Sequence, residues 1–235
     1  MIKFFRKIRY GLMEQNKTGK YFKYAIGEIV LVVIGILIAL QVNNWNQKRL
    51  QTNKAEDSLK LILRDLEMEF LSLSSARNEL STQMHSLIKV SNGEFDEKNL
   101  ESFLFDLTGV FVYSIGNQGY LFLNQPGNLD LIADEELKEA LIYHYENFVP
   151  MLVKWSVWHE NITTNIEEYA MRNLPIEINY TIDTNQLSPL LDGQLKSIIN
   201  FQINSFEDII NFIDATKYEI RDLQNKIKSH NDKIL

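Results

Sequence analysis

The sequence predicts a mainly α-helical protein, with an N-terminal transmembrane helix followed by an elongated helical bundle outside the cytoplasm. Three observations predict this fold class. The chain has only four Pro and ten Gly in 235 residues, an apolar run lies near its start, and apolar residues recur at helical spacing over much of the remainder. Few helix-breaking residues and a period near 3.6 favour helices over a turn-rich β-sandwich.

The apolar run covers residues 25–42 and is interrupted only by Glu28 and Gln41. As a helix it extends about 27 Å, close to the roughly 30 Å hydrocarbon core of a bilayer. Seven Lys or Arg residues precede it, which is rare for the buried core helix of a soluble domain. A cleaved signal peptide is the other alternative, but no pair of small residues at cleavage spacing surrounds Ala39. We therefore expect an uncleaved anchor.

The run divides the chain into three segments. We expect residues 1–24 to form a basic, amphipathic cytoplasmic segment, residues 25–43 the transmembrane helix, and residues 44–235 a helical extracytoplasmic domain. Seven basic residues before the span against three shortly after it predict a cytoplasmic N-terminus. The predicted location is the bacterial inner membrane, crossed once, with the C-terminal domain in the periplasm.

Charge is distributed unevenly along the chain. Residues 1–49 hold nine basic and two acidic side chains, a net +7, whereas residues 50–235 carry a net charge of −14. The basic end suits anionic lipid headgroups, and phosphates would repel the acidic domain, so nucleic-acid binding is not expected. The absence of Cys excludes disulfides and thiol chemistry and suits an oxidising compartment.

One face of the predicted span carries a pattern typical of helix–helix contact. Glu28, Gly35 and Ala39 share this face, and Gly35-x-x-x-Ala39 lets two backbones approach closely. Glu28 has a second interpretation, in which it reaches the headgroups or pairs with Lys20 or Lys23. Association of two copies through this face is one expectation, and contact with another envelope protein is the other.

Residues 44–90 contain no Pro or Gly, and their apolar residues fall mostly three, four or seven apart. This pattern predicts one long amphipathic helix, possibly broken near residues 72–75, with a coiled-coil-like seam that needs partners. Asn92-Gly93 should end it, and Asp96 should cap a helix over residues 97–107.

Residues 108–125 are the least helical stretch, since they mix β-branched and aromatic residues with three Gly. Helix with loops is the preferred prediction there and a β-hairpin the alternative. Asp134 should cap a helix running to about residue 147. A further helix should begin near Pro150 and end before Pro175.

The C-terminal part should begin with an extended loop over residues 176–188. A helix over about residues 190–204 should follow, and Asn204 or Ser205 should cap a separate last helix that reaches nearly to the C-terminus.

Motifs for catalysis or cofactor binding are absent from the sequence. No His-Glu-x-x-His pattern, glycine-rich phosphate loop or Gly-x-Ser-x-Gly elbow occurs, so no metal, cofactor or enzymatic activity is expected. His144 and His159 are expected in solvated or capping positions. Aromatic residues are the best candidates for a ligand pocket, although core packing is the commoner role of such residues: Tyr143, Tyr145, Trp155 and Trp158.

The N-terminal run FFRKIR followed by YAIGEIVLVVIGILIALQVNNWN resembles the start of an uncharacterised family of single-span membrane proteins from Bacteroidota. The stretch GYLFLNQPGNLDLIADEELKEALIYHY, residues 119–145, is similar to a second segment of that family. The resemblance implies the single-span topology and supplies no activity, substrate or catalytic residue.

Two functions from different classes agree with these features. The preferred one is a membrane-anchored interaction or scaffold protein of the cell envelope, which binds itself or another envelope protein. The alternative is an extracytoplasmic sensor of a small molecule that acts through a membrane partner, because the cytoplasmic segment is too short to carry a signalling enzyme.

Overall fold

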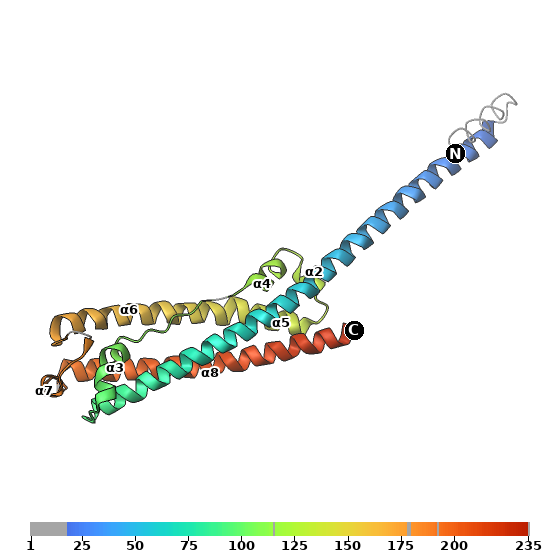
Figure 1. Cartoon of the computed structure of the whole chain (residues 1–235). Coiled ribbons are helices and arrows are strands. Elements are labelled where there is room, and N and C mark those ends of the chain that lie inside the picture. The colour runs from blue at the N-terminus through green and yellow to red at the C-terminus, as the bar shows by residue number, and fades with distance from the viewer. Residues whose placement is uncertain (1–17, 115, 178–179, 192, 235) are drawn as a thin grey trace. The chain divides into compact units, whose positions relative to one another are not determined.

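The computed structural model describes residues 18–114, 116–177, 180–191 and 193–234. Every regular element in these ranges is helical, and no described residue forms a β-strand, so the mainly α prediction is confirmed (Figure 1). In chain order the elements are α2 (Thr18–Ser91), α3 (Glu97–Leu107), α4 (Gln118–Leu123), the 3-10 helix η1 (Leu129–Leu131), α5 (Glu135–Tyr143), the π-helix η2 (His144–Phe148), α6 (Val149–Asn173), α7 (Thr184–Leu187), the 3-10 helix η4 (Ser188–Leu190) and α8 (Gln194–Ile234). The predicted amphipathic segment at residues 1–24 lies mostly outside the described residues.

Helix α2 is a single element of 74 residues and passes through residues 72–75 without a break. There, the Ser74 hydroxyl donates a hydrogen bond to the Phe70 carbonyl, 2.7 Å away, so this serine is accommodated within the helix. The stop predicted at Asn92-Gly93 is confirmed, since Gly93 has a φ of +79° that favours glycine. The chain divides into two compact units within α2, between Lys54 and Ala55.

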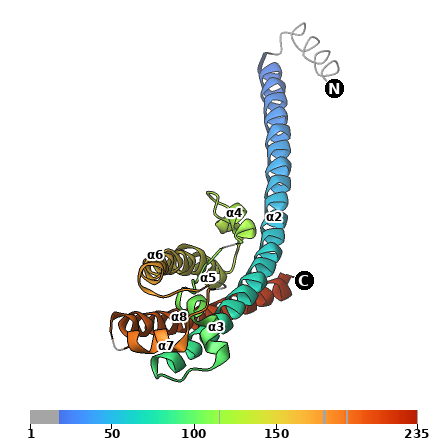
Figure 2. The same cartoon turned by 60° about the vertical axis from the view of Figure 1, so that its left-hand side comes forward.

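In the second unit, α8 runs antiparallel to the part of α2 after Ala55 (Figures 1 and 2). Two ion pairs between the helices show that they run antiparallel. Glu67 of α2 pairs with Arg221 at 2.9 Å, and Arg77, further along α2, pairs with Asp214 at 2.8 Å. The residue number of the α8 partner therefore decreases as the residue number on α2 increases.

Helix α6 completes the bundle and also runs antiparallel to α8. Trp155 stacks on Phe212 with ring centroids 6.0 Å apart, and His159 meets Phe206 at 5.6 Å. The core contains fully buried residues from all three long helices, among them Leu59, Ile62, Leu66, Leu73, Leu80, Leu87, Leu152, Phe206, Ile213 and Ile220. Those from α2 are spaced by three, four or seven, which confirms the predicted amphipathic stripe.

The prediction of two helices at the C-terminal end is wrong. Helix α8 continues from Gln194 to Ile234, and Asn204 and Ser205 lie in its interior. The Ser205 hydroxyl donates to the Phe201 carbonyl at 2.9 Å instead of capping a new helix. A serine can satisfy itself this way inside a helix, so its presence alone does not mark a boundary.

The helix predicted to begin near Pro150 and to end before Pro175 is confirmed by α6, which covers Val149–Asn173. Asp134 caps α5 as expected, accepting from the Leu137 N–H at 3.2 Å, but α5 passes through η2 directly into α6. Pro150 lies in the first turn of α6, immediately after the π-helix. Proline has no N–H to donate to a helical hydrogen bond. The π-helix before it replaces the usual backbone hydrogen-bond pattern with i→i+5 bonds, and the helix continues through Pro150.

The loop predicted over residues 176–188 is only partly extended, because α7 begins at Thr184. Asp183 starts this turn by accepting from the Asn185 N–H at 2.9 Å, and Leu187 is fully buried. Between α3 and α4, the described residues 109–114, 116 and 117 form no regular element, and the preferred prediction of helix with loops is confirmed over the β-hairpin.

Candidate functional site

The N-terminal part of α2 contains the apolar segment. Among the described residues, one helix is long and apolar enough to cross a membrane; its 18-residue window has a mean hydropathy of 2.6, and none of that window is buried. The large apolar side chains from Ile26 to Val42 are between 47% and 63% exposed. The core helix of a soluble domain would instead bury one face against its own protein.

The three residues predicted for helix–helix contact lie on this apolar segment. No atom lies within 4 Å of the position that a Cβ on Gly35 would occupy. Ala39 is exposed and Glu28 is half-buried. The contact face is therefore open in the single chain, and its association with a second helix remains a prediction.

Three of the four aromatic residues predicted to line a pocket belong to one series of ring contacts, and Tyr145 belongs to another. Tyr145 is buried and stacks on Tyr120, with ring centroids 4.1 Å apart, whereas Tyr143 is half exposed and packs edge-on against Phe148. Trp155 and Trp158 contact one another edge-to-face at 5.2 Å. Tyr145 belongs to the core, whereas Tyr143 and the two tryptophans are linked through Phe148 and Phe212, since Phe212 stacks on Phe148 at 6.2 Å and on Trp155 at 6.0 Å.

The extended segment between α3 and α4 is held by polar side chains of α6. The Phe111 N–H donates to Nδ1 of His159 at 2.9 Å, and the Tyr113 N–H donates to the Ser156 hydroxyl at 3.0 Å. One further bond comes from α8, since Nε2 of Gln202 donates to the Gly109 carbonyl at 3.0 Å. Side chains thus satisfy backbone groups that have no helical partner.

His159 is fully buried, so the expectation of a solvated or capping position is wrong. Burial lowers its pKa to about 4. A neutral ring agrees with the geometry, because Nδ1 needs a free lone pair to accept from Phe111. His159 therefore acts as a structural acceptor for the extended segment.

A second buried polar group surrounds Glu69 of α2. Tyr113 donates its hydroxyl hydrogen to Oε1 of Glu69 at 2.5 Å, and Nε2 of His144 lies 3.3 Å from Oε2. His144 is also buried, which corrects its expected solvated or capping position. Burial, and then the negative charge of Glu69, raises the pKa values of Tyr113 and Tyr145.

Sequence reasoning missed this group, although α2 carried a signal for it. Glu69 falls between Leu66 and Leu73 at spacings of three and four, on the apolar stripe that faces the core. A carboxylate at such a position needs hydrogen-bonding partners, because an unpaired charge is costly to bury. The stripe predicted that partners exist, and the fold supplies them from η2 and the extended segment.

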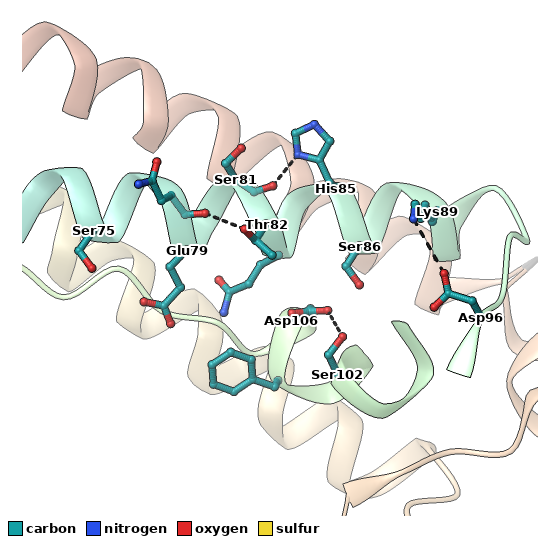
Figure 3. A pocket seen from close by; sticks show the side chains of 13 residues that line it. Ser75, Glu79, Ser81, Thr82, His85, Ser86, Lys89, Asp96, Ser102 and Asp106 are labelled. Carbon is teal, nitrogen blue, oxygen red and sulfur yellow. Dashed lines mark hydrogen bonds and ion pairs between the residues drawn. The ribbon is translucent and has the colours of Figure 1, made fainter. Parts of the chain in front are cut away.

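A groove of about 790 Å³ lies along α2 and α3. Its lining residues are mainly polar: Ser75, Asn78, Glu79, Ser81, Thr82, Gln83, His85, Ser86, Lys89, Asp96, Ser102, Phe105 and Asp106. Figure 3 shows Glu79, Ser86 and Asp106 directed into the space between the two helices, with His85 directed away from it. None of these residues belonged to the predicted pocket, because hydroxyl-rich turns on a long helix have no distinctive sequence pattern.

Asp106 occupies an unusual position in this groove. Its side chain is only 4% exposed, and Oδ2 accepts from the Ser102 hydroxyl at 2.7 Å. Burial raises its pKa, and the hydrogen bond from Ser102 opposes the shift. Lys89 is the described lysine in the lining, and it lies 3.9 Å from Asp96 at one end.

Comparison with known protein families finds a match over part of the chain. A sequence profile of a family of unknown function (DUF6090) matches residues 28–103. The matched segment covers the apolar part of α2, its continuation into the bundle and the start of α3, and it ends before the stretch at 119–145. No curated protein and no solved structure matches the chain. The match confirms that residues 28–103 resemble a family of unknown function.

Proposed function

We propose that this protein is anchored in the bacterial inner membrane by residues 25–42 and that its bundle serves as an interaction or scaffold domain in the periplasm. The supporting observation is the exposure of the apolar segment, none of whose 18-residue window is buried. Transfer of about a dozen such side chains from water into hydrocarbon is worth on the order of 20 kcal/mol. A bilayer supplies the apolar surroundings that the described chain does not.

The proposed orientation rests on the charge asymmetry of the sequence. Basic residues are concentrated before the span, and these are retained on the cytoplasmic side of bacterial membranes. The proposed interaction role draws on exposed apolar side chains of α2 beyond Ala55. Leu61, Met68 and Leu71 are 39%, 64% and 55% exposed and recur at spacings of seven and three. A second copy or another envelope protein is the proposed partner.

The anchor is tested by separating membranes at alkaline pH and by fusing compartment-specific reporters to each end. We expect the chain to stay in the membrane pellet, and a reporter active only outside the cytoplasm to work after Leu235 but not before Met1. The double substitution Leu31→Arg with Leu37→Arg should release the chain, because each charge at mid-span costs about 2.5–3.5 kcal/mol. Leu61→Arg, on an exposed position of the bundle, is the matched control. Retention of the double variant, or release of the unaltered chain, contradicts the anchor.

The groove along α2 and α3 favours a second candidate function, the sensing of a small molecule. Its volume falls within the range of roughly 300–1,000 Å³ typical of ligand sites. The lining residues from Ser75 to Lys89 belong to α2, the helix that also contains the proposed anchor. Purification from native membranes separates the candidates: a stoichiometric protein partner supports the scaffold, and a co-purifying small molecule supports the sensor.

A further inference from the structure

Outside the proposed anchor, the groove of Figure 3 contains a carboxylate that is buried beside neutral partners. Asp106 is 4% exposed and receives a hydrogen bond from the Ser102 hydroxyl, and no described cation pairs with it. Buried charges in proteins are normally paired, because hydroxyls alone replace the hydration of a carboxylate incompletely. Asp106 thus marks a position where a positive charge is missing.

A second, independent feature of the groove is an acceptor without a donor. Gln83 lines the groove, its side chain is 3% exposed, and its Oε1 has no hydrogen-bond partner among the described residues. Buried amide oxygens are nearly always satisfied, so an unsatisfied one beside a cavity is informative. Both features call for a group that donates hydrogen bonds.

We propose that the groove binds a small organic cation, a protonated amine on a short apolar chain, with its ammonium group at Asp106. An ammonium group carries three donors and no acceptor, which matches the carboxylate, amide and hydroxyl acceptors of the lining. Glu79 adds a second carboxylate directed into the same space, and Phe105, 63% exposed, provides an apolar wall for the chain.

The donor set argues against a metal ion as the occupant. Among the described residues, no three His, Cys, Asp or Glu side chains are placed to share one ion. Hydroxyls outnumber carboxylates in the lining, and they suit the weaker, directional bonds of an amine. The residues that line the groove all lie after Ala55, so ligand binding there does not require residues 25–42 to cross a membrane.

The test uses the full chain in a mild non-ionic detergent and three five-carbon probes, 1,5-diaminopentane, 1,5-pentanediol and glutarate, with binding measured by isothermal titration calorimetry. We expect the diamine to bind at millimolar concentration or below, and the diol and the diacid not to bind. Asp106→Asn should weaken diamine binding about tenfold or more. Asp208→Asn removes one charge from an exposed position of α8 and serves as the control for general attraction to an acidic domain.

A structural role for Asp106 predicts a different pattern from a binding role. Because burial disfavours its charge and asparagine can still bond to the Ser102 hydroxyl, Asp106→Asn should keep or raise the melting temperature while binding is lost. Glu79→Gln, on the exposed side of the groove, gives a second variant that does not disturb the core. Three results each overturn the proposal: equal binding of the three probes, no binding of the diamine, or variants at Asp106 and Glu79 that bind as well as Asp208→Asn.

Discussion

The two parts of α2 differ in what surrounds an apolar side chain. Between residues 26 and 42, large apolar side chains occupy every face of the helix and are about half exposed; after Ala55, most of them lie on one fully buried stripe, and Leu61, Met68 and Leu71 are exposed outside it. Backbone geometry is the same in both, since α2 is one unbroken helix. Local sequence therefore determines that both parts are helical. The distribution of apolar residues around the helix indicates what surrounds each part: hydrocarbon on all sides suits the first part, and a protein core on one side suits the second.

The largest expected effect comes from making the same substitution in both parts. Leu66→Ala should lower the free energy of unfolding by about 2–5 kcal/mol, because it leaves a cavity among fully buried residues. Leu37→Ala should leave the stability of the bundle unchanged, since Leu37 is 57% exposed. Urea unfolding of the full chain in detergent, followed by near-ultraviolet circular dichroism, measures both. Equal losses at the two positions would mean that the first part packs against protein.

Acid should destabilise the bundle through His159. The folded protein holds this ring neutral with a pKa of about 4, whereas the unfolded chain takes up a proton below about 6.5. The stability from this group is therefore fully present above pH 6.5 and lost as the pH falls to about 4, a change on the order of 3 kcal/mol.

The contribution of His159 is isolated by comparing the pH dependence of unfolding with that of His159→Asn, whose Oδ1 keeps an acceptor near the Nδ1 position. The variant should show a flatter profile over this range, although its stability at neutral pH is lower. His85→Asn, at an exposed position, should follow the unaltered protein. Parallel profiles for all three proteins would show that His159 titrates normally.

Replacing a glycine with alanine should also change the free energy of unfolding differently in the two regions, by a smaller amount than the leucine substitutions. A Cβ on Gly119 would lie 2.6 Å from the Ile62 nitrogen and 2.8 Å from the Ser58 carbonyl oxygen, both backbone atoms that cannot move aside easily. Gly119→Ala should therefore cost about 1–3 kcal/mol in the urea experiment. Gly35→Ala meets no atom within 4 Å and should have no effect on the bundle. A neutral Gly119→Ala would show that α4 can shift away from α2.

The smallest expected effect concerns contact between copies through Gly35 and Ala39. Gly35→Leu adds bulk to this face and should weaken association of the span by about 1 kcal/mol, seen as less cross-linked dimer in membranes. Val33→Leu adds one carbon to a different face and is the control. Unchanged cross-linking in the Gly35 variant would remove this face from the interaction, and the exposed stripe of Leu61, Met68 and Leu71 would then be the next candidate.

The sequence alone determined the features that depend on neighbours a few residues apart. Apolar spacing predicted α2 and its buried stripe, Asp134 predicted the start of α5, and Gly93 predicted the end of α2. These signals are local, because a helix repeats every 3.6 residues and its caps bond within one turn. The same local rules misplaced a boundary at Ser205, where a serine bonds back within its own helix.

Which polar residues are buried, and which groups they bind, depends on the tertiary structure. His159 and Phe111 are 48 residues apart, and Gln202 reaches Gly109 across 93 residues. The groove likewise forms only where α3 folds back on α2 and brings Asp106 near Glu79. A buried polar group must find its partner wherever the chain places one, so its role depends on the packed arrangement of distant segments and not on its own neighbours in sequence.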